Sequence, residues 1–291
     1  MGKSLIRRST SRARQCRDNK PSAFLHGSTE EHLSLLEVTE RVMPIIAGNS
    51  KLLDNSQPVM WHTDLHMGNI FVSKDDPEEV TGFIDWQNTS INPFFLQARW
   101  PVFLNPPQDY QEGQVMPSLP KGFEQMDNEE KEIALYHKAK ATWSKAYEVA
   151  NYLNDKKSWR AMQVPAPLKE LFRRCGETWD EGIVPLRATL IEIFLNQRDI
   201  GVARGVLSLN FTQEQISSHE REFKDYEEWH EMRKLVKDLL DTDDEGWIAP
   251  GRDLEEIKSR NKMLLEHYIS KMASSKLPEE VKKMWPFLEQ I

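Results

Sequence analysis

Two carboxylates and one carboxamide lie close together in the sequence, near two histidines. The carboxylates are Asp64 and Asp85, the carboxamide is Asn69, and His62 and His66 flank Asp64. Phosphoryl transfer needs a carboxylate that accepts the proton of the attacking hydroxyl. It also needs oxygen ligands for the magnesium that bridges the nucleotide phosphates. These residue types therefore predict a phosphoryl-transfer site, with Asp64 as general base and Asn69 and Asp85 as ligands of Mg²⁺.

A short hairpin is predicted to bring the two metal ligands together. Residues 70–72 and 80–84 are apolar runs of strand length, and the turn-rich residues 73–79 separate them. An antiparallel pair of such strands returns Asp85 to the side of Asn69. Both residues offer hard oxygen ligands, which Mg²⁺ prefers, and Mg²⁺ takes the rest of its shell from water and phosphate.

The spacing His62-x-Asp64-x-x-x-x-Asn69 resembles the catalytic loop of protein kinases. With His66 and Ile84-Asp85-Trp86, the segment more closely resembles the aminoglycoside phosphotransferase and choline kinase branch of the protein kinase-like fold. That branch carries His-Gly-Asp-Leu-His-x-x-Asn followed by Ile-Asp-Trp or Ile-Asp-Phe. Residues 61–66, 84–90 and 93–99 are similar to the fungal subgroup called altered inheritance of mitochondria protein nine.

The resemblance implies an ATP- and Mg²⁺-dependent phosphotransferase that acts on the hydroxyl of a small molecule. It implies Asp64 as base and His62 as a brace of the catalytic loop. Asn69 and Asp85 are implied as metal ligands, and His66 is grouped with them at the cofactor, on the substrate side or behind the metal ligands. The expected partners are a nucleotide and an acceptor that these residues do not identify.

Two other interpretations of the same residues remain open. Asp and Asn often satisfy the backbone of turns, so these side chains could be structural. Imidazole and carboxylate are also common ligands of zinc, so His62, Asp64 and His66 could hold a transition metal.

Composition excludes several classes of protein. The 291 residues are 39% hydrophobic and carry a net charge of −8, which argues against a general nucleic-acid binder. The two cysteines, Cys16 and Cys175, are too few for a disulfide framework or a cysteine zinc site. No apolar run is long enough to cross a bilayer, because Arg187 and Glu192 interrupt the most apolar stretch.

The first 27 residues differ from the rest. Six Lys and Arg residues precede the first acidic residue, Asp18, and lie among Ser and Thr. This composition is typical of a mitochondrial transit peptide, and equally of a disordered basic tail. Together with the resemblance, it predicts a mitochondrial protein, with a cytoplasmic one as the alternative.

Residues 28–291 are predicted to form one helical domain that carries the catalytic loop and hairpin at residues 60–90. Capping signals and helical periodicity predict a series of helices separated by turns, and a Pro-rich structured loop over residues 92–121. The predicted helices cover residues 28–46, 127–153, 166–179, 186–197, 212–240, 253–273 and 277–291. The fold class is thus α+β and mainly α, which matches the large carboxyl-terminal lobe of a kinase-like fold.

The smaller lobe of such an enzyme has no visible counterpart. The residues before Trp61 hold three scattered glycines, which form no Gly-rich loop. Lys3, Lys20 and Lys51 are not set in a strand that could pair with phosphates. The amino-terminal lobe is therefore expected to be largely absent and the catalytic competence reduced. The second hypothesis is a non-catalytic, pseudokinase-like protein that uses the helical lobe to bind a partner.

Overall fold

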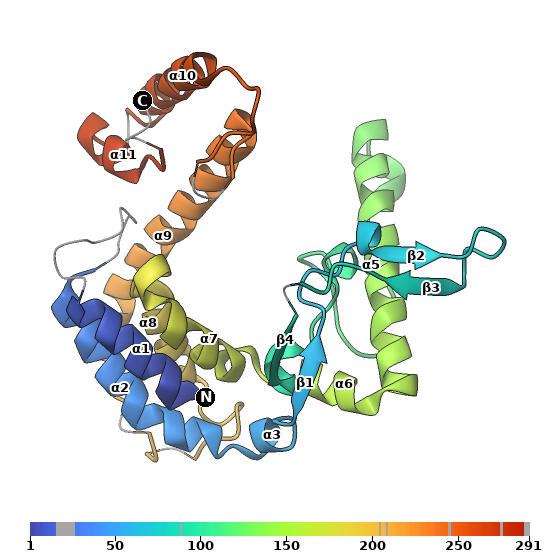
Figure 1. Cartoon of the computed structure of the whole chain (residues 1–291), viewed down its shortest axis with the longest axis horizontal. Coiled ribbons are helices and arrows are strands. Elements are labelled where there is room, and N and C mark those ends of the chain that lie inside the picture. Colours follow the sequence, from blue (N-terminus) through green and yellow to red (C-terminus); the bar gives the residue numbers. More distant parts are fainter. Residues whose placement is uncertain are drawn as a thin grey trace. The chain divides into compact units, whose positions relative to one another are not determined.

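The computed structural model describes residues 1–15, 27–87, 89–203, 205–207, 209–243, 246–273 and 276–287. These residues form two compact units (Figure 1). Unit 1 comprises Met1–Ile46 and Glu170–Ile291, and unit 2 comprises Ala47–Lys169. The sequence predicted one domain over residues 28–291, and the structure instead divides that range. All residues of the predicted site belong to unit 2.

Unit 1 is helical. Its helices are α1 (Gly2–Gln15), α2 (Thr29–Ala47), α7 (Ala166–Glu181), α8 (Val184–Leu195), α9 (Gln213–Leu240), α10 (Leu254–Met272) and α11 (Pro278–Met284). The predicted caps are confirmed at two starts. At α2 the Glu31 N–H donates to the Ser28 hydroxyl, and the Glu31 carboxylate accepts a bond from the Ser28 N–H. Thr212 and Gln215 make the same pair of bonds at α9. Each reciprocal pair satisfies two N–H groups that the first turn leaves open.

The disordered tail predicted for residues 1–27 is wrong for Gly2–Gln15, which form α1. Ile6 and Ala13 are each 2% exposed, and the Ser9 hydroxyl donates a 2.8 Å bond to the Cys175 carbonyl of α7. Composition misled the prediction because the many arginines hide the helical spacing of these small and apolar residues. The rest of that segment, Cys16 included, lies outside the described residues.

An apolar cluster joins the last three helices. Trp229 and Met232 of α9 pack with Leu265 of α10 and with Met284 at the end of α11. The buried Asn261 side chain accepts a 2.8 Å bond from the Trp285 indole and donates a 3.0 Å bond to the Phe287 carbonyl. Since a buried amide without partners is costly, these two bonds fix how the end of the chain docks.

His219 of α9 makes the stability of unit 1 depend on pH. It is 5% exposed, and burial, reinforced by the nearby Arg187 guanidinium, lowers its pKa from 6.5 to about 4. The unfolded chain therefore binds a proton between these pH values that the folded chain does not. Stability from neutral His219 is complete above pH 6.5 and is lost as the pH falls towards 4.

We expect His219→Gln to flatten this pH dependence. Urea unfolding followed by circular dichroism at pH 7 and pH 4.5 measures it. The matched control is His267→Gln, because His267 is exposed on α10 and its loss should leave the acid sensitivity intact. An equal pH response in both variants would contradict the assignment to His219.

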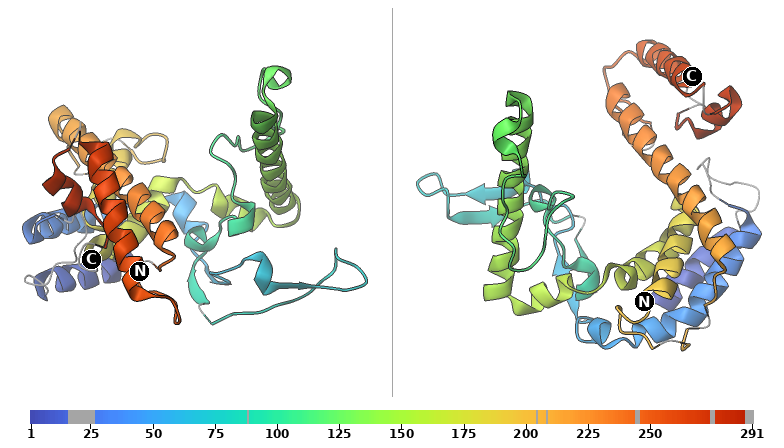
Figure 2. Two further views of the ribbon diagram at one scale, coloured as in Figure 1. Left: turned by 90° about the horizontal axis from the view of Figure 1, so that it is seen from above. Right: turned by 180° about the vertical axis from the view of Figure 1, so that it is seen from behind.

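Unit 2 contains all of the named strands in the described part of the chain. They form two antiparallel pairs, β1 (Pro58–Trp61) with β4 (Ser90–Pro93), and β2 (Ile70–Val72) with β3 (Val80–Phe83). The second pair is the predicted hairpin, and Figure 2 shows it as a narrow ribbon with a long turn at its far end. The first pair was not predicted, because its strands are short and contain Pro58 and Pro93.

The remaining elements of unit 2 are mostly short. They are α3 (Ser50–Leu53), η1 (Met67–Asn69), α4 (Phe94–Gln97), η2 (Val102–Leu104), η3 (Phe123–Gln125), α5 (Asn128–Asn154) and α6 (Lys156–Met162). The predicted cap of α5 is confirmed, with Asp127 and Glu130 exchanging bonds. The loop predicted over residues 92–121 contains α4 and η2.

A small core supports the strands that lead to the site. Phe94 of α4 and Met162 of α6 are buried in it, and Trp61 at the end of β1 packs against it. The Trp61 and Phe94 rings lie 6.3 Å apart. This packing fixes the end of β1, from which the chain continues directly into His62 and Asp64.

Within the described residues, no helix is both long enough and apolar enough to cross a membrane.

Candidate active site

Three backbone segments of unit 2 are joined around Asn69. The Asn69 side-chain amide donates a 3.0 Å bond to the Asp64 carbonyl, which ties the loop after β1 to η1. The Asn69 carbonyl accepts a 3.1 Å bond from the Ile84 N–H, which ties η1 to the end of β3. Asn69 is 5% exposed, so both bonds are shielded from water. Asp64, Asn69 and Asp85 are thereby held in one place, as the hairpin prediction required.

Asp85 has an unusual backbone. Its φ is 64°, in the left-handed region that residues other than Gly adopt rarely, although Asp and Asn do so more than most. The residue directly follows Ile84, whose N–H is bonded to Asn69. Such a conformation costs on the order of 1 kcal/mol and is concentrated at functional sites. It turns the chain directly after the residue whose N–H is bonded to Asn69.

His62 braces the same junction. Its Nε2 lies 2.7 Å from the Ile84 carbonyl, and because a carbonyl only accepts, Nε2 carries the proton. The ring also lies 4.8 Å from the Trp86 ring, at 59°. These contacts agree with the bracing role predicted for His62, since they link the base loop to the residues on both sides of Asp85.

His66 is the cap residue at the start of η1. Its Nδ1 accepts a 3.1 Å bond from the Gly68 N–H, as a helix cap does. The ring is exposed. One ring nitrogen is thus committed to the local backbone, and contact of His66 with a cofactor stays a prediction.

The Asp64 and Asp85 carboxylates are free to react. Both residues are exposed, and within the described residues neither carboxylate makes a hydrogen bond or ion pair. Within the described residues, these two side chains therefore satisfy no turn backbone. The Asn69 side chain does bond a loop carbonyl, but it does so through its amide nitrogen alone.

The described residues give no support to the zinc interpretation. Among the residues that the structure describes, no three His, Cys, Asp or Glu side chains come together as a metal site. His62 and His66 each use one ring nitrogen for a backbone group. A magnesium site needs fewer protein ligands, because one or two protein oxygens suffice when phosphates and water complete the coordination shell. Asn69 and Asp85 fit that requirement.

An aromatic pocket lies beside the base loop. We define it by Trp61, His62, Trp86, Arg99, Trp100 and Tyr147, and its volume is about 290 Å³. Thr63 and Leu65, the chain neighbours of Asp64, also line it. The Arg99 guanidinium donates a 3.0 Å bond to the Thr63 carbonyl, next to the proposed base.

Sequence reasoning missed Arg99, Trp100 and Tyr147 as site residues. Arg99 and Trp100 follow α4, whereas Tyr147 comes from the distant helix α5. The Tyr147 hydroxyl donates a 3.4 Å hydrogen bond to the Arg99 carbonyl. A single aromatic residue on a helix gives no sequence signal for such a role, because core positions look the same. The repeated tryptophans from residue 61 to 100 were the available signal.

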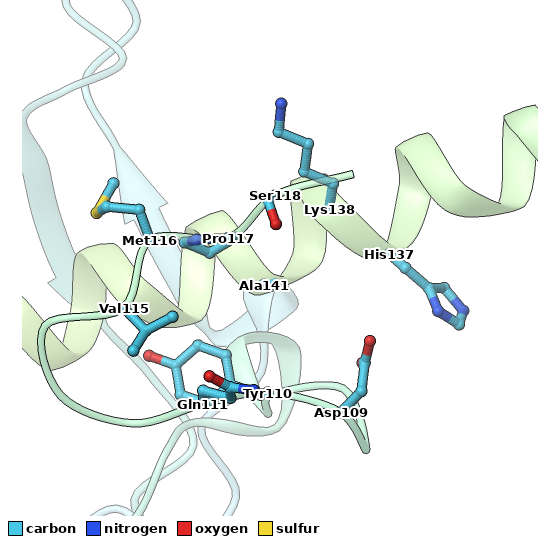
Figure 3. A pocket seen from close by; sticks show the side chains of 10 residues that line it. All are labelled: Asp109, Tyr110, Gln111, Val115, Met116, Pro117, Ser118, His137, Lys138 and Ala141. Atoms are coloured by element: carbon cyan, nitrogen blue, oxygen red, sulfur yellow. The ribbon is translucent and has the colours of Figure 1, made fainter. Parts of the chain in front are cut away.

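A buried ion pair anchors the loop behind the pocket. Lys145 and Glu148 of α5 are 2.7 Å apart, and their side chains are 4% and 6% exposed. Lys145 also donates to the Gln111 and Gly113 carbonyls at 3.0 and 2.8 Å, while Glu148 accepts from the Gly113 N–H and the Tyr110 hydroxyl. Figure 3 shows Tyr110 and Gln111 from this loop around a smaller pocket beside α5.

The surrounding hydrogen bonds favour the ionised form of Glu148. Burial by itself raises the pKa of Glu148, but bonds from Lys145, Tyr110 and Gly113 outweigh it and lower that pKa below its ordinary value. Burial and the same carboxylate raise the pKa of Tyr110. The Tyr110 ring in turn lies 6.4 Å from the Trp100 ring, edge-on, so the ion pair supports one wall of the aromatic pocket.

Comparison with known proteins agrees with the chemistry of this site. The model of the phosphotransferase enzyme family, APH, matches residues 6–96, a range that includes His62, Asp64, Asn69 and Asp85. Subtelomeric hrmA-associated cluster proteins from two strains of Aspergillus fumigatus are each 25% identical over 264 residues. The match covers 89% of this chain, which spans about half the length of those relatives. No solved structure matches the chain. The segment that carries the site thus resembles kinase-like phosphotransferases.

Proposed function

We propose that the chain is a phosphotransferase that moves the γ-phosphoryl group of ATP to the hydroxyl of a small molecule. The main observation in support is that Asn69 makes two hydrogen bonds. Its side-chain amide donates to the Asp64 carbonyl, and its backbone carbonyl accepts from the Ile84 N–H. This arrangement supports the proposal because it ties the backbone of Asp64 and of Ile84, the residue before Asp85, to Asn69. The family match over residues 6–96 supports the same reaction class.

Asn69 and Asp85 are the residues that hold Mg²⁺ in this proposal. Bound there, Mg²⁺ neutralises charge on the phosphates. Asn69 fits because its amide nitrogen is committed to the Asp64 carbonyl, so the side-chain oxygen is the end that remains for a metal. Asp85 fits because its carboxylate has no partner among the described residues and follows a residue bonded to Asn69.

Asp64 acts on the acceptor. Its carboxylate takes the proton of the acceptor hydroxyl as that oxygen bonds to the γ-phosphorus. The bond between the γ-phosphorus and its bridging oxygen breaks, and the electron pair leaves with ADP. His62 keeps the base loop in register with Asp85 through the Ile84 carbonyl. Because the loop is fixed before substrate binds, less reorganisation is needed during transfer.

Magnesium dependence tests the proposed ligands. Hydrolysis of ATP to ADP and phosphate serves as the assay because water can replace the acceptor. We expect Asn69→Ala to raise the magnesium concentration needed for half-maximal rate by about 10- to 100-fold, the worth of one charged contact. The control is Asn105→Ala, an exposed position in the same unit. A rate independent of Mg²⁺, or equal curves for both variants, would overturn the ligand assignment.

A non-catalytic binding protein is the second candidate. It is favoured by one observation: none of the four strands in the described part of the chain carries a lysine that could pair with phosphates. We also propose membership of the fungal subgroup named above and a mitochondrial location, the latter from the Arg-rich residues of α1. Fractionation of cells that make the native protein tests the location, and recovery outside mitochondria would refute it.

A further inference from the structure

We infer that the aromatic pocket takes the acceptor, and that this acceptor carries a flat apolar ring and an anionic group such as a carboxylate. The inference rests on the proposed function and names its substrate class. Three tryptophans and Tyr147 provide the apolar wall, and a volume near 290 Å³ is at the small end of the range for small-molecule sites. Planar rings pack well against such side chains.

The charge of the pocket selects against a cation. No Asp or Glu is among its lining residues in the described part of the chain, and Arg99 is its one Lys or Arg. Arg99 makes no ion pair with any described residue, and its guanidinium donates a hydrogen bond to the neutral Thr63 carbonyl. Most of its N–H groups therefore remain for a ligand, and a guanidinium binds carboxylates through paired bonds. Arg99 is exposed, so a ligand can reach it.

A second donor in the wall lacks an acceptor. The buried Nε1 of Trp100 makes no hydrogen bond with any described residue. An indole nitrogen only donates, and a buried donor without an acceptor is unfavourable. Arg99 and Trp100 are adjacent in the chain and both line the pocket. Because this nitrogen is buried, the anionic group is expected to meet the Arg99 guanidinium first, and the Trp100 donor becomes available only if the wall adjusts to the ligand.

The position of the pocket suits an acceptor. Thr63 and Leu65, the chain neighbours of Asp64, line the pocket, so the proposed base and the proposed acceptor site share one loop. Arg99 holds the carbonyl of the residue before Asp64, so one side chain both grips the ligand and positions the base loop. In this arrangement the ring of the acceptor packs against the aromatic wall, its anionic group binds Arg99, and its hydroxyl faces Asp64.

Three matched probes test the charge preference: 4-(hydroxymethyl)benzoate, 4-methylbenzyl alcohol and 4-(aminomethyl)benzyl alcohol. They share a ring and a hydroxymethyl group and differ in charge. Binding to the whole chain is measured without nucleotide by saturation-transfer NMR titration. We expect the benzoate to bind about tenfold more tightly than the neutral alcohol, which is the worth of one charged contact, and the ammonium compound to bind weakest.

Variants of Arg99 test whether this residue causes the preference for an anionic ligand. Arg99→Gln should remove the advantage of the benzoate, and Arg99→Lys should restore part of it. The control is Arg160→Gln, which removes an arginine that lines a different pocket of unit 2. Equal binding of all probes, tightest binding of the ammonium compound, or no binding of any probe would overturn the inference. So would displacement of the benzoate by a non-hydrolysable ATP analogue, because the pocket would then belong to the nucleotide.

The two proposals fail separately. Probe binding is measured without nucleotide or Mg²⁺, so its result does not depend on whether the chain turns over ATP. Charge-selective binding without any Mg²⁺-dependent ATP turnover would refute the phosphotransferase and leave the pocket assignment standing. Turnover without charge-selective binding would refute the acceptor class alone.

Discussion

Asp64→Asn is expected to lower Mg²⁺-dependent ATP turnover by about 10²- to 10⁴-fold, the usual contribution of a general base. The substitution keeps the size of the side chain and removes its ability to take a proton. The carbonyl that bonds Asn69 belongs to the backbone of residue 64, so that bond survives the change. Turnover is measured by ADP release at saturating nucleotide.

The substitution should act on chemistry and leave nucleotide binding nearly intact. The matched control is Asp75→Asn, which removes an exposed carboxylate from the turn between β2 and β3. Its turnover should equal that of the unaltered chain. If Asp64→Asn turned over ATP at the unaltered rate, Asp64 would not be the base.

Lys145→Met is expected to destabilise the protein by about 3–5 kcal/mol, because it leaves the Glu148 carboxylate buried without its partner. Both side chains are nearly inaccessible, and Lys145 makes three bonds that methionine cannot replace. Urea unfolding followed by tryptophan fluorescence measures the loss. Hydrogen exchange over residues 105–122 gives a local readout, since those residues are anchored by the pair.

The double variant Lys145→Met with Glu148→Leu should recover much of that stability, because it removes the unpaired charge together with its partner. The control for the single change is Lys138→Met, an exposed lysine on the same helix that should change stability by less than about 0.5 kcal/mol. A loss equal to that of the control would mean that the pair does not anchor the loop.

The helices and the hairpin could be predicted because their signals are local. The capping boxes at Ser28, Asp127 and Thr212 are readable within four residues, and the hairpin follows from two apolar runs around a turn. The bonds of Asn69 to Asp64 and Ile84 are also made by segments close in sequence, while the roles of Asp64, Asn69 and Asp85 stay predictions. Local pattern was sufficient wherever the structure is made by near neighbours in sequence.

Features made by distant residues could not be predicted. The pairing of β1 with β4 joins residues about thirty apart through short strands, and α1 is held by Cys175 far along the chain. Tyr147 reaches the aromatic pocket from α5, and nothing in its own neighbourhood indicates this. The division into two units is likewise set by packing, because both ends of the chain contribute to unit 1.

Calorimetric titration of the whole chain with a non-hydrolysable ATP analogue, with and without Mg²⁺, tests the central claim most directly. If Asn69 and Asp85 hold the metal, binding should require Mg²⁺ and should weaken about 10- to 100-fold in Asp85→Asn. Absence of binding, or binding that is equal without Mg²⁺ and in Asp85→Asn, would contradict the account.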